Sequence, residues 1–441
     1  MPADPAVTSE HLGPGVVIVV LNLPVPDDHR VWAEAQSLRQ AGARVTVVCP
    51  AIRGLKPGAA EIDGIGVVYF RSFEGSGKLG TIIEGVWTTT VSSRAAKRAL
   101  KRFAGERYVQ VCNPPDTLYR LLRWARRRGA GTVYDQHDVV PVLAASRPAF
   151  RRLEPLFLAF ERRTVAASDT ILTPSGEQAR RLHEIYGRTA TVVRTASVPG
   201  DPTPRPAAEP GQEQVTVLGY LGVIGEQDGV SDLVEAIHEL RGRGLTGFRV
   251  EIAGDGPALP EVRKRVAELG LEDLITLRGW LGRTELAGFL DGIDAMLVPD
   301  PDVEFNHYCA MNKVTHSMAR GIPVVLRPLR ENSRIAGEAG IQAADMSLPA
   351  FADAIAVFLA ATPQERADRG RRLREEFDQG LSWETSSVGY LAAFSLLPSG
   401  RASGSARVKV QAQAKAQAEP ASPAVSSAAA SAASTAAEEP V

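Results

Sequence analysis

Short apolar runs alternate with longer amphipathic ones along most of this chain, and this alternation restricts the fold more than any other feature. Between the apolar runs lie helical patterns such as residues 29–42, where Val31, Ala35 and Leu38 recur at helical spacing before Gly42. The apolar runs of the first half are residues 16–23, 44–50, 66–70, 108–112, 132–138, 170–175 and 191–195. Strands that are apolar throughout and alternate with helices predict an α/β fold with a parallel sheet covered on both faces.

Residues 199–213 (PGDPTPRPAAEPGQE) interrupt this pattern, and their Pro and Gly content predicts an interdomain linker. The alternation resumes in residues 215–222, 248–254, 275–280, 295–300, 322–326 and 340–344. A chain of 441 residues is long enough for two cores, so we predict tandem α/β domains over residues 1–198 and 214–381. Residues 401–441 hold no aromatic residue and are rich in Ala and Ser, which predicts a disordered tail.

The composition is that of a soluble globular protein, with 44% apolar and 23% charged residues. Three widely spaced cysteines, Cys49, Cys112 and Cys309, fit neither a disulfide framework nor a zinc spacing. No apolar run is long enough to span a bilayer. We therefore expect a cytoplasmic protein, with peripheral attachment to the inner face of the cell membrane left open.

The formal net charge of −1 hides an uneven distribution. Residues 1–200 hold 27 Lys and Arg against 18 Asp and Glu, and the remainder holds 23 against 33. Either the first domain faces something anionic, or these are solvated helix faces. The basic helices 93–103 and 121–129 could face an anionic membrane, at about 1 kcal/mol per Lys or Arg. Aromatic residues make up 6% of the chain and the sequence contains no recognisable nucleic-acid-binding motif, so no nucleic-acid partner is expected.

Open α/β sheets bind ligands at the carboxyl ends of their strands, so the turns that follow the strands are the places to search. In residues 20–30, either Asp27 or Asp28 is expected to cap the next helix, which leaves His29 and Arg30 available to a ligand. In residues 134–141, the strand end carries Asp135, His137 and Asp138. A carboxylate there can fix the tautomer of His137, although a structural histidine is the alternative.

Two further turns lie in the second half. Gly222 and Gly225, in residues 219–237, could let backbone N–H groups approach phosphate oxygens, or could simply form a tight turn. Lys313, in residues 309–325, could pair with a phosphate as a point charge, or could be a solvated surface lysine. No G-x-S-x-G elbow, P-loop or H-E-x-x-H is present, and the D-x-D of residues 300–302 is common by chance.

Several segments together resemble glycosyltransferase family 4. They are NLPVPDDHRVWAEAQSLRQAGARVTVVCP, CNPPDTLY, YDQHD, LGYLGVIGEQDGV, IAGDGP, MNKVTHSMARGIPVV and RENSRIAGEAG, in this order. The resemblance runs from about Val16 to Leu397 and implies the GT-B fold, in which two Rossmann-like domains face each other across a cleft. Residues 382–397 resemble the closing helix that crosses back to the first domain.

The resemblance implies transfer of a sugar from a nucleotide sugar with retention of configuration, without a metal or cofactor. The first domain would bind a glycan or lipid-linked acceptor, and the second the donor. His137 and Lys313 are the catalytic candidates that the resemblance suggests. The donor-binding candidates are Gly222, Val223, Gly225, Arg194, Asn312, His316 and Glu331, and the acceptor-side candidates are Asp27, His29 and Asp138.

The sequence also departs from the family pattern. Family members commonly carry two glutamates eight positions apart, where this chain has Tyr308 and His316, and Val142 stands where the nearest branch tends to have Glu. A neutral imidazole accepts one ribose hydroxyl proton, whereas a carboxylate accepts two. The leading hypothesis is a glycosyltransferase of surface polysaccharide or glycoconjugate assembly. A catalytically degenerate paralogue that binds a nucleotide sugar or partner proteins is the alternative, and a nucleotide-sugar 2-epimerase ranks last.

Overall fold

The computed structural model describes residues 13–73, 75, 77–147, 150–197 and 215–396. The predicted linker, residues 199–213, and the predicted tail, residues 401–441, lie outside the described residues. The described chain forms two sheets, one from residues 15–192 and one from residues 216–342. We call the residues around the first sheet (13–197) the first half, and those around the second sheet (215–381) the second half.

The first sheet has eight strands in the order β3-β4-β2-β1-β5-β6-β7-β8, and its pairings are parallel except for β3 with β4. The strands are β1 (Gly15–Val19), β2 (Arg44–Ala51), β3 (Gly58–Ile62), β4 (Ile65–Arg71), β5 (Arg107–Cys112), β6 (Gly131–Asp135), β7 (Thr170–Thr173) and β8 (Thr191–Val192).

Helices cover both faces of this sheet. They are α1 (His29–Gln40), α2 (Gly77–Arg102), α3 (Tyr119–Arg126), α4 (Val140–Ser146), the short 3-10 helix η2 (Arg151–Leu153), α5 (Glu154–Ala167) and α6 (Gly176–Tyr186). Alternate residues of β1 enter different cores, because successive strand side chains point to opposite faces. Val16 and Ile18 pack with α1, whereas Val17 and Val19 pack with α2, α3 and α5.

The second sheet has six strands, all parallel, in the order β11-β10-β9-β12-β13-β14. The strands are β9 (Thr216–Leu221), β10 (Phe248–Ala253), β11 (Ile275–Gly279), β12 (Ala295–Val298), β13 (Val324–Leu326) and β14 (Ile341–Gln342). The strand order reverses direction at β9, so the carboxyl ends of β9 and β12 border the crevice where open α/β sheets bind ligands.

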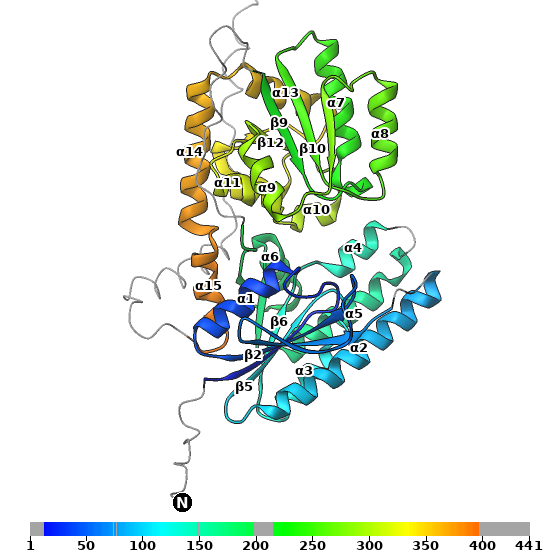
Figure 1. The fold of residues 1–441 in the computed structure, drawn as a ribbon, viewed down its shortest axis with the longest axis vertical. Coiled ribbons are helices and arrows are strands. Elements are labelled where there is room, and N and C mark those ends of the chain that lie inside the picture. Colours follow the sequence, from blue (N-terminus) through cyan, green and yellow to red (C-terminus); the bar gives the residue numbers. More distant parts are fainter. Residues whose placement is uncertain (1–12, 74, 76, 148–149, 198–214, 397–441) are drawn as a thin grey trace, which may run out of the picture. The chain divides into compact units, whose positions relative to one another are not determined.

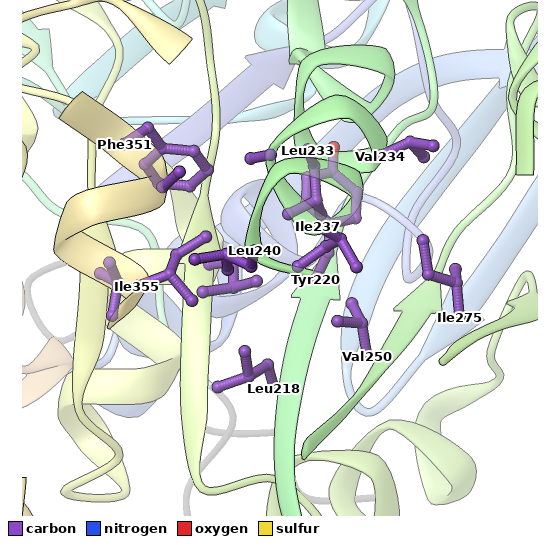
Figure 2. Close-up of a cluster of buried hydrophobic side chains, with 14 of the residues drawn as sticks. Leu218, Tyr220, Leu233, Val234, Ile237, Leu240, Val250, Ile275, Phe351 and Ile355 are labelled. Atoms are coloured by element: carbon purple, nitrogen blue, oxygen red, sulfur yellow. The ribbon is translucent and has the colours of Figure 1, made fainter. Parts of the chain in front are cut away.

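The helices of the second half are η3 (Glu226–Asp228), α7 (Val230–Gly242), α8 (Leu259–Glu268), α9 (Arg283–Asp291), α10 (Glu304–Tyr308), α11 (Asn312–Ala319), α12 (Arg330–Ala336), η4 (Gly337–Ala339), α13 (Leu348–Ala360) and α14 (Pro363–Gly380). Figure 2 shows one of the two cores, in which α7 and α13 pack on β9 and β10 through Ile237, Leu240 and Phe351, all fully buried. Each such side chain contributes about 1.5–3 kcal/mol of hydrophobic stabilisation.

The last described helix, α15 (Trp383–Ala392), follows α14 and lies beside α1 (Figure 1). Tyr390 and Phe394 join the core of the first sheet that also contains α1. Their rings meet edge to face with centroids 5.1 Å apart, and Phe394 also meets Tyr108 at 5.4 Å. The end of the chain beyond the second half is thus anchored on the first sheet.

The predicted fold class, α/β with two sheets, is confirmed, and each of the predicted strands corresponds to an observed one. Strand β3 was not predicted, because its sequence GAAEI is exposed and poor in β-branched residues. It pairs antiparallel with β4 across the turn at Asp63 and Gly64. Within the described residues, no helix is both long and apolar enough to cross a membrane.

Candidate functional site

The loop after β6 is held at the carboxyl edge of the first sheet by Asn113, which follows β5. The Asn113 side-chain oxygen accepts hydrogen bonds from the backbone N–H groups of His137 (2.6 Å) and Asp138 (3.1 Å). The Asn113 amide donates back to the Asp138 carbonyl at 2.7 Å. These bonds give the loop a defined conformation. The side chain of His137, which the loop carries, is 14% exposed.

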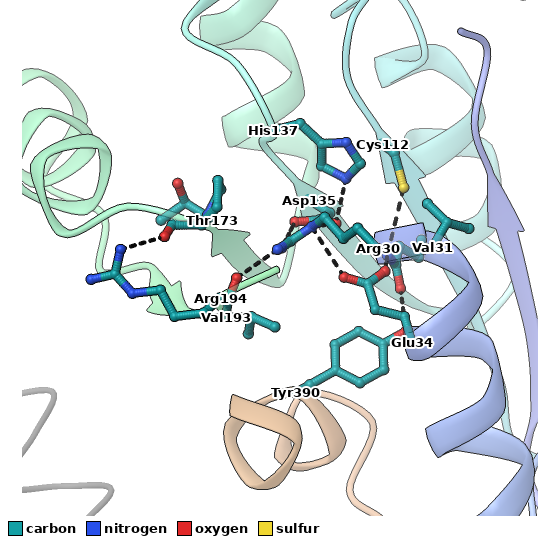
Figure 3. A network of polar contacts seen from close by, with 12 residues as sticks. Arg30, Val31, Glu34, Cys112, Asp135, His137, Thr173, Val193, Arg194 and Tyr390 are labelled. Carbon is teal, nitrogen blue, oxygen red and sulfur yellow. Dashed lines mark hydrogen bonds and ion pairs between the residues drawn. The ribbon is translucent and has the colours of Figure 1, made fainter. Parts of the chain in front are cut away.

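The ring of His137 is oriented by Asp135. Nε2 lies 2.7 Å from Asp135 Oδ2, and the same carboxylate accepts hydrogen bonds from Arg30 Nε (3.1 Å) and Nη2 (2.7 Å), as Figure 3 shows. Burial opposes ionisation of Asp135, but Arg30 and His137 together hold its pKa well below the usual range. The predicted role of a carboxylate beside His137 thus falls to Asp135.

Cys112, Asp135 and His137 bring three potential metal-ligand atoms within 4.8 Å of one another. Both oxygens of Asp135 are already bonded to the Arg30 guanidinium. Burial also raises the pKa of the Cys112 thiol, so it keeps its proton at neutral pH. These residues therefore do not suit a metal ion.

The acceptor-side candidates lie around the start of α1. Asp28 caps the helix by accepting the Val31 N–H at 3.0 Å, so one aspartate has the capping role that the sequence suggested. Asp27 is exposed and pairs with Arg53 at 3.3 Å. His29 is exposed. The expectation that Arg30 is available to a ligand is wrong, because Arg30 is 5% exposed and bound to Asp135.

The turn after β9 carries the glycine-rich candidates. The N–H of Gly222 donates to Ala253 O (3.1 Å), that of Ile224 to Asp255 O (3.0 Å), and that of Gly225 to Asp228 Oδ2 (3.1 Å). Among the described residues, only Val223 of residues 222–225 has an N–H without such a partner, and its side chain is 56% exposed. The turn can offer a ligand one backbone amide rather than several.

Lys313, in the first turn of α11, is 7% exposed and therefore not a solvated surface lysine. Its Nζ lies 2.9 and 2.8 Å from the two oxygens of Asp300 and 4.5 Å from the centre of the Tyr220 ring. Burial raises the pKa of Asp300, although Lys313 opposes this effect. The carboxylates of the D-x-D tripeptide are both paired, Asp300 with Lys313 and Asp302 with His307 (2.8 Å).

Asn312 and His316 lie on the same helix as Lys313. Asn312 is the first residue of α11 and is exposed, whereas His316, one turn further on, is partly buried. Burial lowers the pKa of His316 to about 4, and the nearby His29 and Arg320 contribute in the same direction. His316 is therefore neutral at pH 7.

Arg194 and Glu331 form a buried ion pair instead of lining a ligand surface. They are 3% and 0% exposed, and Arg194 Nη1 lies 2.5 Å from Glu331 Oε1. Glu331 also accepts the backbone N–H groups of Gly176 (3.2 Å) and Glu177 (3.1 Å) at the start of α6. In this structure both residues join α12 to α6, and neither charge is left for a ligand.

The loop that carries His137 and the end of α10 in the second half meet at Gln178 of α6. Gln178 Nε2 donates to the backbone carbonyls of His137 (3.2 Å) and Tyr308 (3.4 Å). The segment that leads into α11 therefore lies next to the loop that carries His137. A separate cavity of about 750 Å³ lies at the opposite, amino-terminal edge of the second sheet, lined in part by Thr216, Arg320 and Arg366. It is not part of the candidate site.

The sequence interpretation missed the pairing of Arg30 and Glu34 with Asp135. A signal was present, because Glu34 falls among Val31, Ala35 and Leu38 on the apolar face of α1. A carboxylate at such a position needs a buried partner. Its partners come from β5 and β6, which the sequence does not identify.

Two family models match the chain. The model described as Glycosyltransferase Family 4 matches residues 29–196, and the model described as Glycosyl transferases group 1 matches residues 215–361. Together they cover both sheets. The chain belongs to glycosyltransferase family 4.

Curated relatives of this family 4 member include 2-deoxystreptamine glucosyltransferase of Streptomyces kanamyceticus, 30% identical over 113 residues, 26% of this chain and 28% of that protein. Alpha-D-kanosaminyltransferase of the same organism is 26% identical over 33% of this chain and 36% of its own length. The chain thus spans about a third of the length of these two relatives. The GDP-mannose-dependent alpha-(1-6)-phosphatidylinositol dimannoside mannosyltransferase of Mycobacterium tuberculosis is 25% identical over 64% of this chain and 72% of its own length.

Solved structures share the fold. Sucrose-phosphate synthase from Thermosynechococcus elongatus superposes with a TM-score of 0.66 at 16% identity, over 85% of this chain and 96% of that one. HepE from Anabaena, solved with UDP and glucose, superposes with a TM-score of 0.62 at 13% identity, over 87% and 100%. At this level of identity the likeness shows the fold alone, which is GT-B.

Proposed function

We propose that this protein is a metal-independent retaining glycosyltransferase that moves a sugar from a nucleotide sugar to a glycan or lipid-linked acceptor. The observation that carries the proposal is the contact of Gln178 with both His137 and Tyr308. This contact places the oriented histidine of one sheet edge beside the segment that leads to Lys313 on the other. Membership in family 4 supports the same reaction class.

The departing nucleoside diphosphate would lie at the turn after β9. The Val223 amide can donate one hydrogen bond, and Lys313 supplies a positive charge close by. The Lys313 Cε lies 3.5 Å from the position that a Cβ on Gly222 would take, so the lysine reaches this turn. A diphosphate bound there would share Lys313 with Asp300 and receive electrostatic stabilisation as it leaves.

His137 and His316 would contact hydroxyl groups. His137 is fixed by Asp135, so its second ring nitrogen can meet a sugar hydroxyl in a defined direction. His316 is neutral at pH 7, and we propose it for the contact with the ribose. Asp27, His29 and Asp138 are the residues that we propose for the acceptor side, because they follow β1 and β6 at the same sheet edge.

A nucleotide-binding paralogue without transfer activity is the second candidate. It is favoured by Tyr308 and His316 at the positions of two family glutamates, and by the full pairing of Lys313 and Glu331 inside the protein. Both candidates predict nucleotide binding, and only the first predicts turnover.

A panel of nucleotide sugars separates the two candidates. We expect the protein to consume at least one of these donors and to form a product with the anomeric configuration of the donor. Chromatography of the released nucleotide measures the consumption. Binding of UDP or GDP in a calorimeter without consumption of any donor would select the paralogue. Neither binding nor consumption, in a sample shown to be folded, would remove both.

We also propose that the acceptor is lipid-linked and that the helix layer of α2, α3, η2 and α5 rests on an anionic membrane. These helices carry thirteen Lys and Arg residues against three acidic ones. Among the described side chains, exposed Val86 and Trp87 on α2 and Leu156 on α5 add apolar contact area. The relative named for a phosphatidylinositol dimannoside supports an acceptor of this class. We therefore also propose a cytoplasmic location and a role in glycoconjugate or surface polysaccharide assembly.

Sedimentation with vesicles tests the membrane contact. The wild-type protein should sediment with phosphatidylglycerol vesicles at low salt and be released at high salt, because screening weakens surface electrostatics. Replacing exposed Arg123 and Arg127 by Glu should reduce the bound fraction. The control replaces exposed Arg263 and Arg372 of the second half, with the same change in charge. Equal binding of the two variants would contradict the proposal.

A further inference from the structure

Arg30 is held inside the first half by contacts far away in the sequence. Two of its nitrogens donate to Asp135, 105 residues later, and Nη1 donates to the Val193 carbonyl at 2.6 Å. Nε also lies 3.3 Å from Glu34, one turn along α1. With these bonds the guanidinium has a single orientation and does not reach a ligand. Its effect on the site has to pass through Asp135.

Asp135 is fully buried, and its carboxylate accepts hydrogen bonds from Arg30 and His137. A buried carboxyl group without a cation would take up a proton, because burial disfavours the charged form. Beside Arg30 the carboxylate stays ionised. An ionised carboxylate accepts hydrogen bonds and donates none, so the hydrogen between Asp135 and His137 belongs to Nε2 of the histidine.

A second buried carboxyl group, Glu34, shares this cluster (Figure 3). Burial and the neighbouring Asp135 raise the pKa of Glu34 well above its usual value. Gln110 donates to Glu34 at 2.7 Å, and the Tyr390 hydroxyl of α15 donates to Gln110 at 2.8 Å. Of the two carboxyl groups, Asp135 is the one that receives both hydrogen bonds from Arg30 and lies next to His137.

We propose that Arg30 is a positioning residue of the candidate site. By clamping Asp135, it fixes His137 with Nε2 protonated and Nδ1 presented to a ligand as a hydrogen-bond acceptor. Within the described residues Nδ1 has no hydrogen-bond partner, and the ring is 14% exposed. The identity of the ligand hydroxyl, on the sugar or on its acceptor, rests on the proposed function. The tautomer of His137 does not depend on the proposed function.

The tautomer can be read directly in a protein labelled with ¹⁵N-histidine. Long-range ¹⁵N–¹H correlations at mildly alkaline pH distinguish which ring nitrogen carries the hydrogen in each of the seven histidines, and a His137→Gln variant assigns the signal. We expect the Nε2–H form for His137. A wild-type protein with His137 in the Nδ1–H form would overturn the proposal, whatever the variants do.

Variants of Arg30 test its part in this arrangement. Arg30→Gln removes the cation, so Asp135 should take up a proton and donate it to Nε2, which changes His137 to the Nδ1–H form. Arg30→Lys keeps the charge and should keep the Nε2–H form. A folded Arg30→Gln protein with unchanged His137 signals would overturn the role of Arg30. If Arg30→Gln does not fold, a change of tautomer in Arg30→Lys would overturn it, and an unchanged tautomer would support it.

The matched control is Arg181→Gln. Arg181 is also 5% exposed and forms a buried pair with Glu161, at 2.7 and 3.0 Å. Its loss should lower stability without altering the tautomer of His137. Where the enzyme turns over, Arg30→Gln should lower kcat about tenfold or more with a smaller change in KM, as expected for an orienting group. Absence of turnover in all samples counts against the transferase proposal alone, because the tautomer is measured without substrate.

Discussion

His316 shows how one side chain limits what α11 can bind. Its pKa is lowered to about 4 by burial, so the imidazole is neutral across the physiological range. A neutral imidazole accepts one hydrogen bond, and a carboxylate at the same position would accept more. Under the proposed function, His316 would therefore hold the ribose more weakly than a glutamate would, because of its residue type and not because of the fold.

The lowered pKa of His316 also has an effect on stability. The unfolded chain binds a proton near pH 6.5 and the folded chain only near pH 4, so stability present above pH 6.5 is lost as the pH falls towards 4. The loss attributable to His316 is up to about 3 kcal/mol. Urea unfolding of the wild type and His316→Gln at several pH values measures it. Equal losses in both proteins would contradict the assignment.

Glu331 is a second residue whose charge is paired inside the protein. Although burial opposes ionisation, Arg194 and Arg334 hold its pKa below the usual value near 4.5. This stability is present above pH 4.5 and disappears as the pH falls through the lower folded-state pKa. Glu331→Gln should cost about 3–5 kcal/mol at pH 7, because it leaves Arg194 buried without its partner.

The control for this substitution is Glu304→Gln, which breaks an exposed pair with Arg330. Exposed pairs contribute less than about 1 kcal/mol, so the two variants should differ clearly in denaturant unfolding. Similar values would show that the Arg194–Glu331 pair contributes no more than a surface pair.

At the scale of elements, the turn after β9 is shaped by backbone contact rather than by phosphate-binding amides. A Cβ on Gly254, where φ is +148°, would lie 1.8 Å from the Gly222 carbonyl oxygen. Gly254→Ala should therefore displace residues 222–225 and weaken binding of UDP or GDP, measured by calorimetry. Gly270→Ala is the control, because Gly270 also has a positive φ (+62°) but nothing lies within 4 Å of its added Cβ. Equal nucleotide affinity in both variants would contradict this role of the turn.

The strands could be predicted from the sequence because each is a continuous apolar run, and the order of such runs with helices implies a parallel sheet. The partners of charged residues could not be predicted. Arg30 and Lys313 both sit at helix starts and both were expected to face a ligand, yet Asp135 and Asp300 bind them inside the protein. These contacts depend on which strand ends are neighbours in space, and the residue pattern of one strand does not contain that information.

At the scale of the whole molecule, the charge asymmetry of the sequence has a structural location. The basic excess of the first 200 residues is concentrated on α2, α3, η2 and α5, which cover one face of the first sheet, whereas α1 and α15 cover the other. The candidate acceptor-side residues and the basic layer belong to the same half of the chain. A lipid-linked acceptor is the substrate class that would bring a membrane to the basic helices and a sugar acceptor to the acceptor-side residues.

The most direct test of the account is the rate of donor consumption by the wild type and by His137→Gln, with folding of both checked by circular dichroism. We predict that the wild type consumes at least one nucleotide sugar and that kcat of the variant falls about 100-fold or more, because His137 is the oriented side chain at the joined sheet edges. Equal rates in the two proteins, or no consumption of any donor by a folded wild type, would contradict it.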